Sequence, residues 1–107
     1  MKTSERDREL RELVSRIVEA VHPLRVILFG SAARGEAGSQ SDLDLLIVMP
    51  DGTHRRRTAQ FLYRHIQGIR VPYDLAVATE GDLDRYGSSP GLMLKSALEE
   101  GRTLYAA

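Results

Sequence analysis

The chain has 107 residues, 42% hydrophobic and 28% charged, as is usual for a folded protein, and we expect one domain over residues 1–107. Its 15 basic residues balance 15 acidic ones, which gives no indication of a nucleic-acid or membrane surface, and the lack of cysteine excludes disulfides and thiolate metal sites. No apolar run reaches membrane-spanning length and the charged N-terminus does not resemble a signal peptide, so we expect no membrane contact and a cytoplasmic protein.

The first half of the chain is predicted to form a helix followed by two strands. The helix is capped by Thr3 or Ser4 and ends at His22-Pro23, because the residue before a proline avoids the helical region. Its apolar face, at helical spacing, is Leu10, Leu13, Val14, Ile17, Val18 and Val21. The elements that follow are a strand over residues 25–29, a brief helix around 32–36, a loop over 37–41 and a strand over 42–49.

The second half is predicted to alternate helix and strand. A helix from residue 53 to about 66 is expected to turn Phe61, Leu62 and Ile66 inward. The elements after it are a strand over residues 71–79, a short helical turn capped by Thr79 and a last helix from Ser89-Pro90 to Gly101. Helices between successive strands indicate an α/β fold. The brief connection between the first two strands favours a small mixed sheet with helices packed against it.

A Gly-Ser step follows the first predicted strand. Gly30 permits close approach of a ligand to the backbone, and Ser31 begins a helix whose N–H groups can bind a phosphate. The step is neither a Walker loop nor a dinucleotide fingerprint, because the required lysine and glycine spacing are missing. Taken alone, it is an ordinary helix start.

Three aspartates lie on or beside the predicted strands. Asp42 and Asp44 are separated by one residue, so they emerge on the same face about 7 Å apart. Like charges held together raise each other's pKa unless a cation compensates them, and Mg²⁺ prefers such oxygen ligands. Asp74, in the third strand, shares its face with small Ala76 and Ala78. The coincidence of Gly-Ser with these three acids favours a two-metal phosphoryl-transfer site over turn chemistry.

The stretch GSAARGEAGSQSDLDLLIV resembles the signature of the polymerase β-like nucleotidyltransferases, and most closely the minimal nucleotidyltransferases paired with HEPN-domain toxins. The family pattern is met by Gly30, Ser31, Gly35, Ser41, Asp42 and Asp44. The closing SALEEGRTLY also resembles the C-terminal helix of that family, so the resemblance covers nearly the whole chain. Ala32 stands where relatives often carry arginine, and Arg34 is expected to compensate by contacting the nucleotide.

The resemblance implies a catalytic core of the polymerase β type that transfers a nucleoside monophosphate, AMP from ATP in the first instance, onto a hydroxyl. Asp42 and Asp44 would hold two Mg²⁺ ions, and Asp74 would bind the second ion and help to activate the acceptor. Gly30 and Ser31 would bind the β- and γ-phosphates. A HEPN-domain toxin is the implied partner and acceptor, which makes the chain an antitoxin; self-association stays open.

Two other interpretations remain at this point. The chain could be an antitoxin that neutralises its partner by contact, without turnover. The run HRRR, residues 54–57, places three arginines near a helix start, where the helix dipole disfavours positive charge. It is either a solvated helix end or a contact for an acidic partner or nucleic acid.

Overall fold

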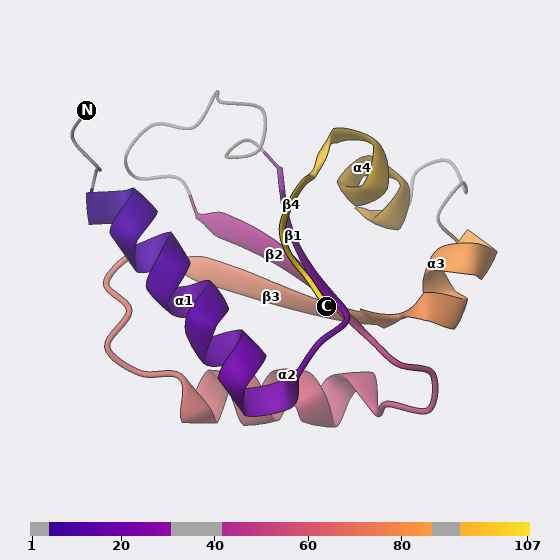
Figure 1. Ribbon diagram of the computed structural model, residues 1–107, viewed down its shortest axis with the longest axis horizontal. Helices are drawn as coiled ribbons and strands as arrows, with labels where there is room; N and C mark the ends of the chain where they lie inside the picture. Colours follow the sequence, from indigo (N-terminus) through magenta and orange to yellow (C-terminus); the bar gives the residue numbers. More distant parts are fainter. Residues whose placement is uncertain (1–4, 31–41, 87–92) are drawn as a thin grey trace.

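The computed structural model describes residues 5–30, 42–86 and 93–107 (Figure 1). The predicted cap at Thr3 or Ser4, the brief helix around 32–36, the loop over 37–41 and the Ser89-Pro90 helix start lie outside these residues. The described helices are α1 (Glu5–Val21), α2 (Arg55–His65), α3 (Glu80–Tyr86) and α4 (Met93–Glu100). The strands are β1 (Arg25–Phe29), β2 (Leu43–Met49), β3 (Tyr73–Thr79) and β4 (Arg102–Ala106). None of the described helices is long and apolar enough to cross a membrane.

The four strands form one mixed sheet in the order β3-β2-β1-β4, which confirms the predicted fold class. β1 pairs antiparallel with β2 and with β4, whereas β2 and β3 run parallel. The parallel pair needs a crossover, and α2 supplies it between β2 and β3.

The last helix ends at Gly101 as predicted, but the strand β4 that follows it was not predicted, and the end of the SALEEGRTLY stretch belongs to this strand instead of to a helix. α4 ends at Glu100, and the chain turns at Gly101 to pair with β1. A Cβ atom on Gly101 would collide with the carbonyl of Ala97 and with the side chain of Ile27, so only glycine fits where the turn packs on β1. Beyond the turn, Thr103 and Tyr105 are strand-favouring residues, and they are the signal from which β4 could have been predicted.

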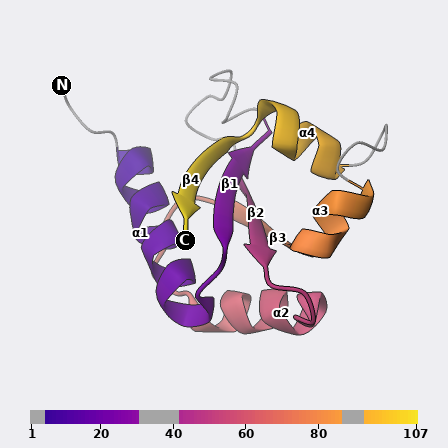
Figure 2. The ribbon, with the colours of Figure 1, turned by 45° about the vertical axis from the view of Figure 1, so that its right-hand side comes forward.

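Side chains on the two faces of the sheet enter two separate hydrophobic clusters. On β2, the alternate residues Leu43, Leu45, Ile47 and Met49 pack with α1 and α2 in one cluster, while Leu46 and Val48 pack with Leu83 of α3 and Ala97 of α4 in the other. Figure 2 displays the sheet with α1 on one side and α3 and α4 on the other. Asp44 is in phase with Leu46 and Val48, so it lies on the α3–α4 face.

α2 buries fewer apolar residues than its sequence predicts. Leu62 and Ile66 are buried as expected, but the expectation for Phe61 is wrong, because its side chain is 46% exposed. Its ring instead stacks on His65, one helical turn away, with the ring centres 5.1 Å apart. Helical spacing places residues 62 and 66 on one face and residue 61 about 100° away, which turns Phe61 outward.

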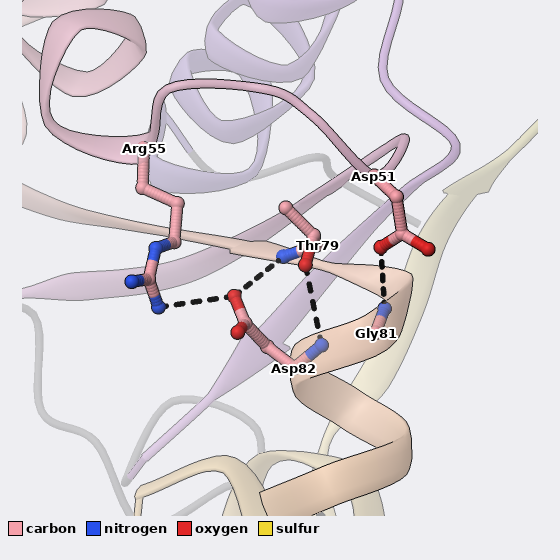
Figure 3. A network of polar contacts seen from close by, with 5 residues as sticks. All are labelled: Asp51, Arg55, Thr79, Gly81 and Asp82. Atoms are coloured by element: carbon pink, nitrogen blue, oxygen red, sulfur yellow. Dashed lines mark hydrogen bonds and ion pairs between the residues drawn. The ribbon is translucent and has the colours of Figure 1, made fainter.

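A polar network joins α2 and α3 where β2 and β3 end (Figure 3). Thr79 Oγ1 accepts a hydrogen bond from the N–H of Asp82 (3.2 Å), and Asp82 Oδ2 accepts one from the N–H of Thr79 (3.0 Å). This reciprocal capping confirms the predicted cap at Thr79. The bond from the Thr79 N–H, with the Arg55 charge 3.1 Å away, lowers the pKa of the buried Asp82. Asp51 accepts a further bond from the N–H of Gly81 (2.8 Å).

The network also accounts for part of the arginine run. Arg55 is paired with Asp82, so a negative charge offsets one of the three positive charges at the start of α2. His54 caps this helix by accepting a hydrogen bond at Nδ1 from the N–H of Arg57 (3.2 Å). Arg56 and Arg57 are exposed and make no ion pair with any residue that the structure describes.

Thr79→Ala is expected to lower the free energy of unfolding by about 1 kcal/mol, the usual cost of losing a side-chain helix cap. Urea denaturation followed by circular dichroism measures this difference. Thr53→Ala is the matched control, because the Thr53 side chain makes no hydrogen bond with a described residue. Equal stability of the two variants would show that the cap contributes nothing.

Candidate active site

Asp44 and Asp74 lie side by side on adjacent parallel strands. They are direct register partners between β2 and β3, so both carboxylates project from the same face about one strand spacing apart. Ala76 and Ala78 follow Asp74 on that face, as the sequence predicts, and belong to the α3–α4 cluster. The structure thus brings together two predicted site residues that are 30 positions apart in the chain.

Gly30 lies directly against the Asp44 carboxylate. It follows β1 with φ of +74°, and a Cβ atom added to it would be 2.6 Å from Asp44 Oδ2. The positive φ disfavours any other residue at this position, and a side chain here would also have to displace the Asp44 carboxylate. The sequence pointed to Gly30 as a phosphate-contacting residue; its contact with Asp44 is an additional reason for glycine that only the strand pairing reveals.

The environment of Asp44 disfavours its charged form. Asp44 is half-buried, and the residue opposite it on the neighbouring strand β1 is the apolar Phe29. Burial raises the pKa of Asp44 most, followed by the negative charges of Asp74 and Asp42. No ion pair or hydrogen bond joins the side chains of Asp44 and Asp74 to another described residue. Mutual repulsion between the three acids is consequently uncompensated by the described part of the protein.

Asp42 stands just before β2 and is exposed, as is Asp74. Its charge acts on Asp44, so all three predicted carboxylates lie in one region. Ser31 and Arg34, the predicted phosphate contacts, lie outside the described residues.

The donor set fits a hard divalent cation. Every candidate ligand here is a carboxylate oxygen, and Mg²⁺ is usually held by one or two carboxylates together with substrate phosphates. Within the described ranges, no three acidic, histidine or cysteine side chains are grouped closely enough to hold a metal by themselves. The site therefore suits an ion that arrives with a phosphate ligand better than one held by protein alone.

The profile of the nucleotidyltransferase domain matches residues 7–105, which is nearly the whole chain. The chain belongs to the nucleotidyltransferase domain family. This family is part of the polymerase β-like superfamily, so the resemblance of the GSAARGEAGSQSDLDLLIV stretch is confirmed. A search of curated proteins gives no match.

Two solved structures share the fold of this nucleotidyltransferase domain. One is a Sulfolobus solfataricus protein described as a candidate nucleotidyltransferase, 24% identical, with a TM-score of 0.63 over 92% of this chain and 78% of that one. The other is from a toxin–antitoxin structure with AMP-PNP, 20% identical, with a TM-score of 0.57 over 90% of this chain and 73% of that one. At these identities the similarity establishes the fold.

Asp44→Asn is expected to raise stability at neutral pH. Because the pKa of Asp44 is raised in the native state, the native protein binds its proton more tightly than the unfolded chain does. The free energy of unfolding therefore falls as pH rises from the ordinary aspartate value of 3.8 through the native pKa, and stays reduced above it. Asparagine carries no charge at any pH, so the Asp44→Asn variant does not undergo this fall in the free energy of unfolding.

Thermal unfolding at several pH values tests this expectation. The midpoint of Asp44→Asn should exceed that of the wild type near pH 7, and the difference should shrink toward pH 4. The exposed Asp84, on α3, provides the control substitution Asp84→Asn. A less stable Asp44→Asn variant at neutral pH would mean that the carboxylate is compensated after all.

Proposed function

We propose that this nucleotidyltransferase domain transfers a nucleoside monophosphate, AMP from ATP in the first instance, onto a hydroxyl group in a Mg²⁺-dependent reaction. The observation that carries the proposal is the pairing of Asp44 with Asp74 beside Gly30. Two uncompensated carboxylates next to a glycine that exposes its backbone are suited to a cation bound with a triphosphate. Family membership supports transferase chemistry.

The three acids take different roles in this proposal. Asp42 and Asp44 are the residues that would hold two Mg²⁺ ions, with Asp74 as a ligand of the second. When bound, the ions would supply positive charge that offsets the charge of the phosphates and of the departing pyrophosphate. Asp74 is exposed, so its carboxylate can accept a hydrogen bond from an acceptor hydroxyl and orient it.

Gly30 and the residues after it are proposed to hold the triphosphate. The absence of a side chain at Gly30 leaves its N–H accessible, and the Ser31 hydroxyl and the Arg34 guanidinium are proposed to donate further hydrogen bonds to phosphate oxygens. Neutralising Asp44 by a cation would also remove the repulsion that raises its pKa. Binding of the substrate with its cation would then also remove the repulsion between the carboxylates.

A HEPN-domain toxin is the proposed partner and acceptor. The sequence resemblance to minimal nucleotidyltransferases supports it, as does the fold similarity to the chain from a toxin–antitoxin structure with AMP-PNP. In this proposal the chain is a single-domain antitoxin, 1–107, that acts in the cytoplasm by adenylylating its partner.

A second candidate is an antitoxin that neutralises its partner by contact alone. The observation in its favour is the fold similarity to the chain from a toxin–antitoxin structure, because neutralisation by contact needs the fold and not turnover. In that case the acidic cluster would be a remnant of an ancestral site.

Asp74→Asn separates the two candidates. In the enzyme, Asp74 acts on the acceptor more than on the nucleotide, so Mg-ATP binding should stay within a few-fold of wild type while transfer slows at least ~100-fold. Calorimetry measures binding, and intact mass spectrometry of a co-expressed HEPN toxin measures transfer. The wild type and the control Asp84→Asn should add a nucleotide-sized mass to the toxin.

One combination of results would contradict the enzymatic proposal. If Asp74→Asn protects cells as well as wild type does, and neither version adds mass to the toxin, the protein neutralises by contact and the enzymatic proposal fails.

A further inference from the structure

The two outer strands of the sheet differ in how their free edges are covered. On β3, the N–H of Leu75 donates a hydrogen bond to Tyr63 Oη of α2 at 2.8 Å, and the Tyr63 ring stacks on Tyr73 with centres 6.0 Å apart. On β4, one edge pairs with β1, and no described residue pairs with the other. An open strand edge is a template for pairing with another chain.

An apolar groove runs beside this open edge, between α1 and β4. It has a volume of about 640 Å³. Its apolar lining consists of Leu10, Val14, Val18, Leu104 and Tyr105. All of these except Leu10 are only half-buried, so the groove combines an unpaired backbone edge with incompletely covered apolar side chains. Figure 2 displays α1 and β4 next to each other at one margin of the molecule.

The charges along the groove have opposite signs at its two ends. α1 and β4 run in the same direction, because both run opposite to β1 (Figure 2). Arg11 and Arg102 therefore lie toward one end and Glu19 toward the other. None of the three makes an ion pair with any residue in the described ranges. Asp7 also lines the arginine end, but it has contacts of its own.

We propose that two copies of the chain associate through this edge, with their β4 strands antiparallel about a two-fold axis. Antiparallel pairing reverses one groove relative to the other, so Arg11 and Arg102 of each copy come next to Glu19 of the other copy. The surface is thus complementary to itself, which is the condition for a two-fold interface. Apolar side chains of both grooves meet in the middle, and the two sheets become one continuous sheet.

The same geometry leaves the candidate active site open. Asp44 and Asp74 lie on β2 and β3, and β1 separates these strands from β4. Dimerisation is therefore independent of the proposed transfer reaction, and neither result decides the other. The short β4 strand and the irregular pairing at Val26 and Ile27 limit the interface, so the dimer is expected to be weak and reversible.

Sedimentation equilibrium over about a hundredfold range of concentration tests association directly. The apparent mass should rise from that of one chain to that of two. Because the chain contains no cysteine, single substitutions can also locate the contact. Thr103→Cys or Leu104→Cys, near the proposed axis, should form a disulfide-linked dimer under mild oxidation, whereas Gln60→Cys on α2 should not.

Charge reversal tests the self-complementarity. Arg102→Glu and Glu19→Arg should each weaken the dimer about tenfold, because each places like charges together at two symmetric positions. The double variant should recover wild-type association, since it restores both pairs across the axis. Circular dichroism and Mg-ATP calorimetry check that each variant keeps its fold and its candidate site.

Three results would overturn the proposal. The first is a chain that stays monomeric at every concentration. The second is a dimer that crosslinks through Gln60→Cys and not through β4. The third is a double charge reversal that associates no better than the single ones.

Discussion

The repulsion between carboxylates at one end of the β2–β3 pair is the constraint on which the rest of the site depends. Parallel register fixes Asp44 beside Asp74, and a Cβ atom on Gly30 would displace the Asp44 carboxylate. Burial and neighbouring acids raise the pKa of Asp44, so the fold carries a local electrostatic cost at neutral pH. A cation bound with a triphosphate is the simplest partner that would remove this cost, which is why we connect it with nucleotidyl transfer.

At the opposite end of the same strands, the acidic group is compensated by protein partners. Where β3 ends, the Asp82 carboxylate accepts a hydrogen bond from the N–H of Thr79 and pairs with Arg55, and the pKa of this carboxyl is lowered. One acidic group is thus fully compensated and ties α2 to α3, while Asp44 and Asp74 are left without protein partners among the described residues. The sheet is secured at one end, and the uncompensated charge is confined to the other.

Much of this arrangement could be predicted from the sequence, because strand alternation is a local property. It predicted that Asp74 shares its face of the sheet with Ala76 and Ala78, and the structure agrees. The contact of Gly30 with Asp44 depends on the pairing of β1 with β2, and no local pattern encodes that pairing.

The wrong prediction for Phe61 and the missing prediction of β4 have the same origin. Phe61 was predicted to face inward because it is apolar, but helical phase turns it outward, and the strand after Gly101 forms by pairing with the distant β1. In both cases contacts with distant parts of the chain decided the local structure, and the sequence contains only weak signals of those contacts.

The most direct test of the account locates the cation. Amide NMR spectra recorded while Mn²⁺ is added with ATP should lose the signals of Gly30, Asp44 and Asp74 first, because paramagnetic broadening falls steeply with distance. The signals of Phe61 on α2 and Tyr105 on β4 should persist, and Asp42→Asn combined with Asp44→Asn should abolish the effect. Broadening that begins at the arginines of α2, or that survives the double substitution, would contradict the account.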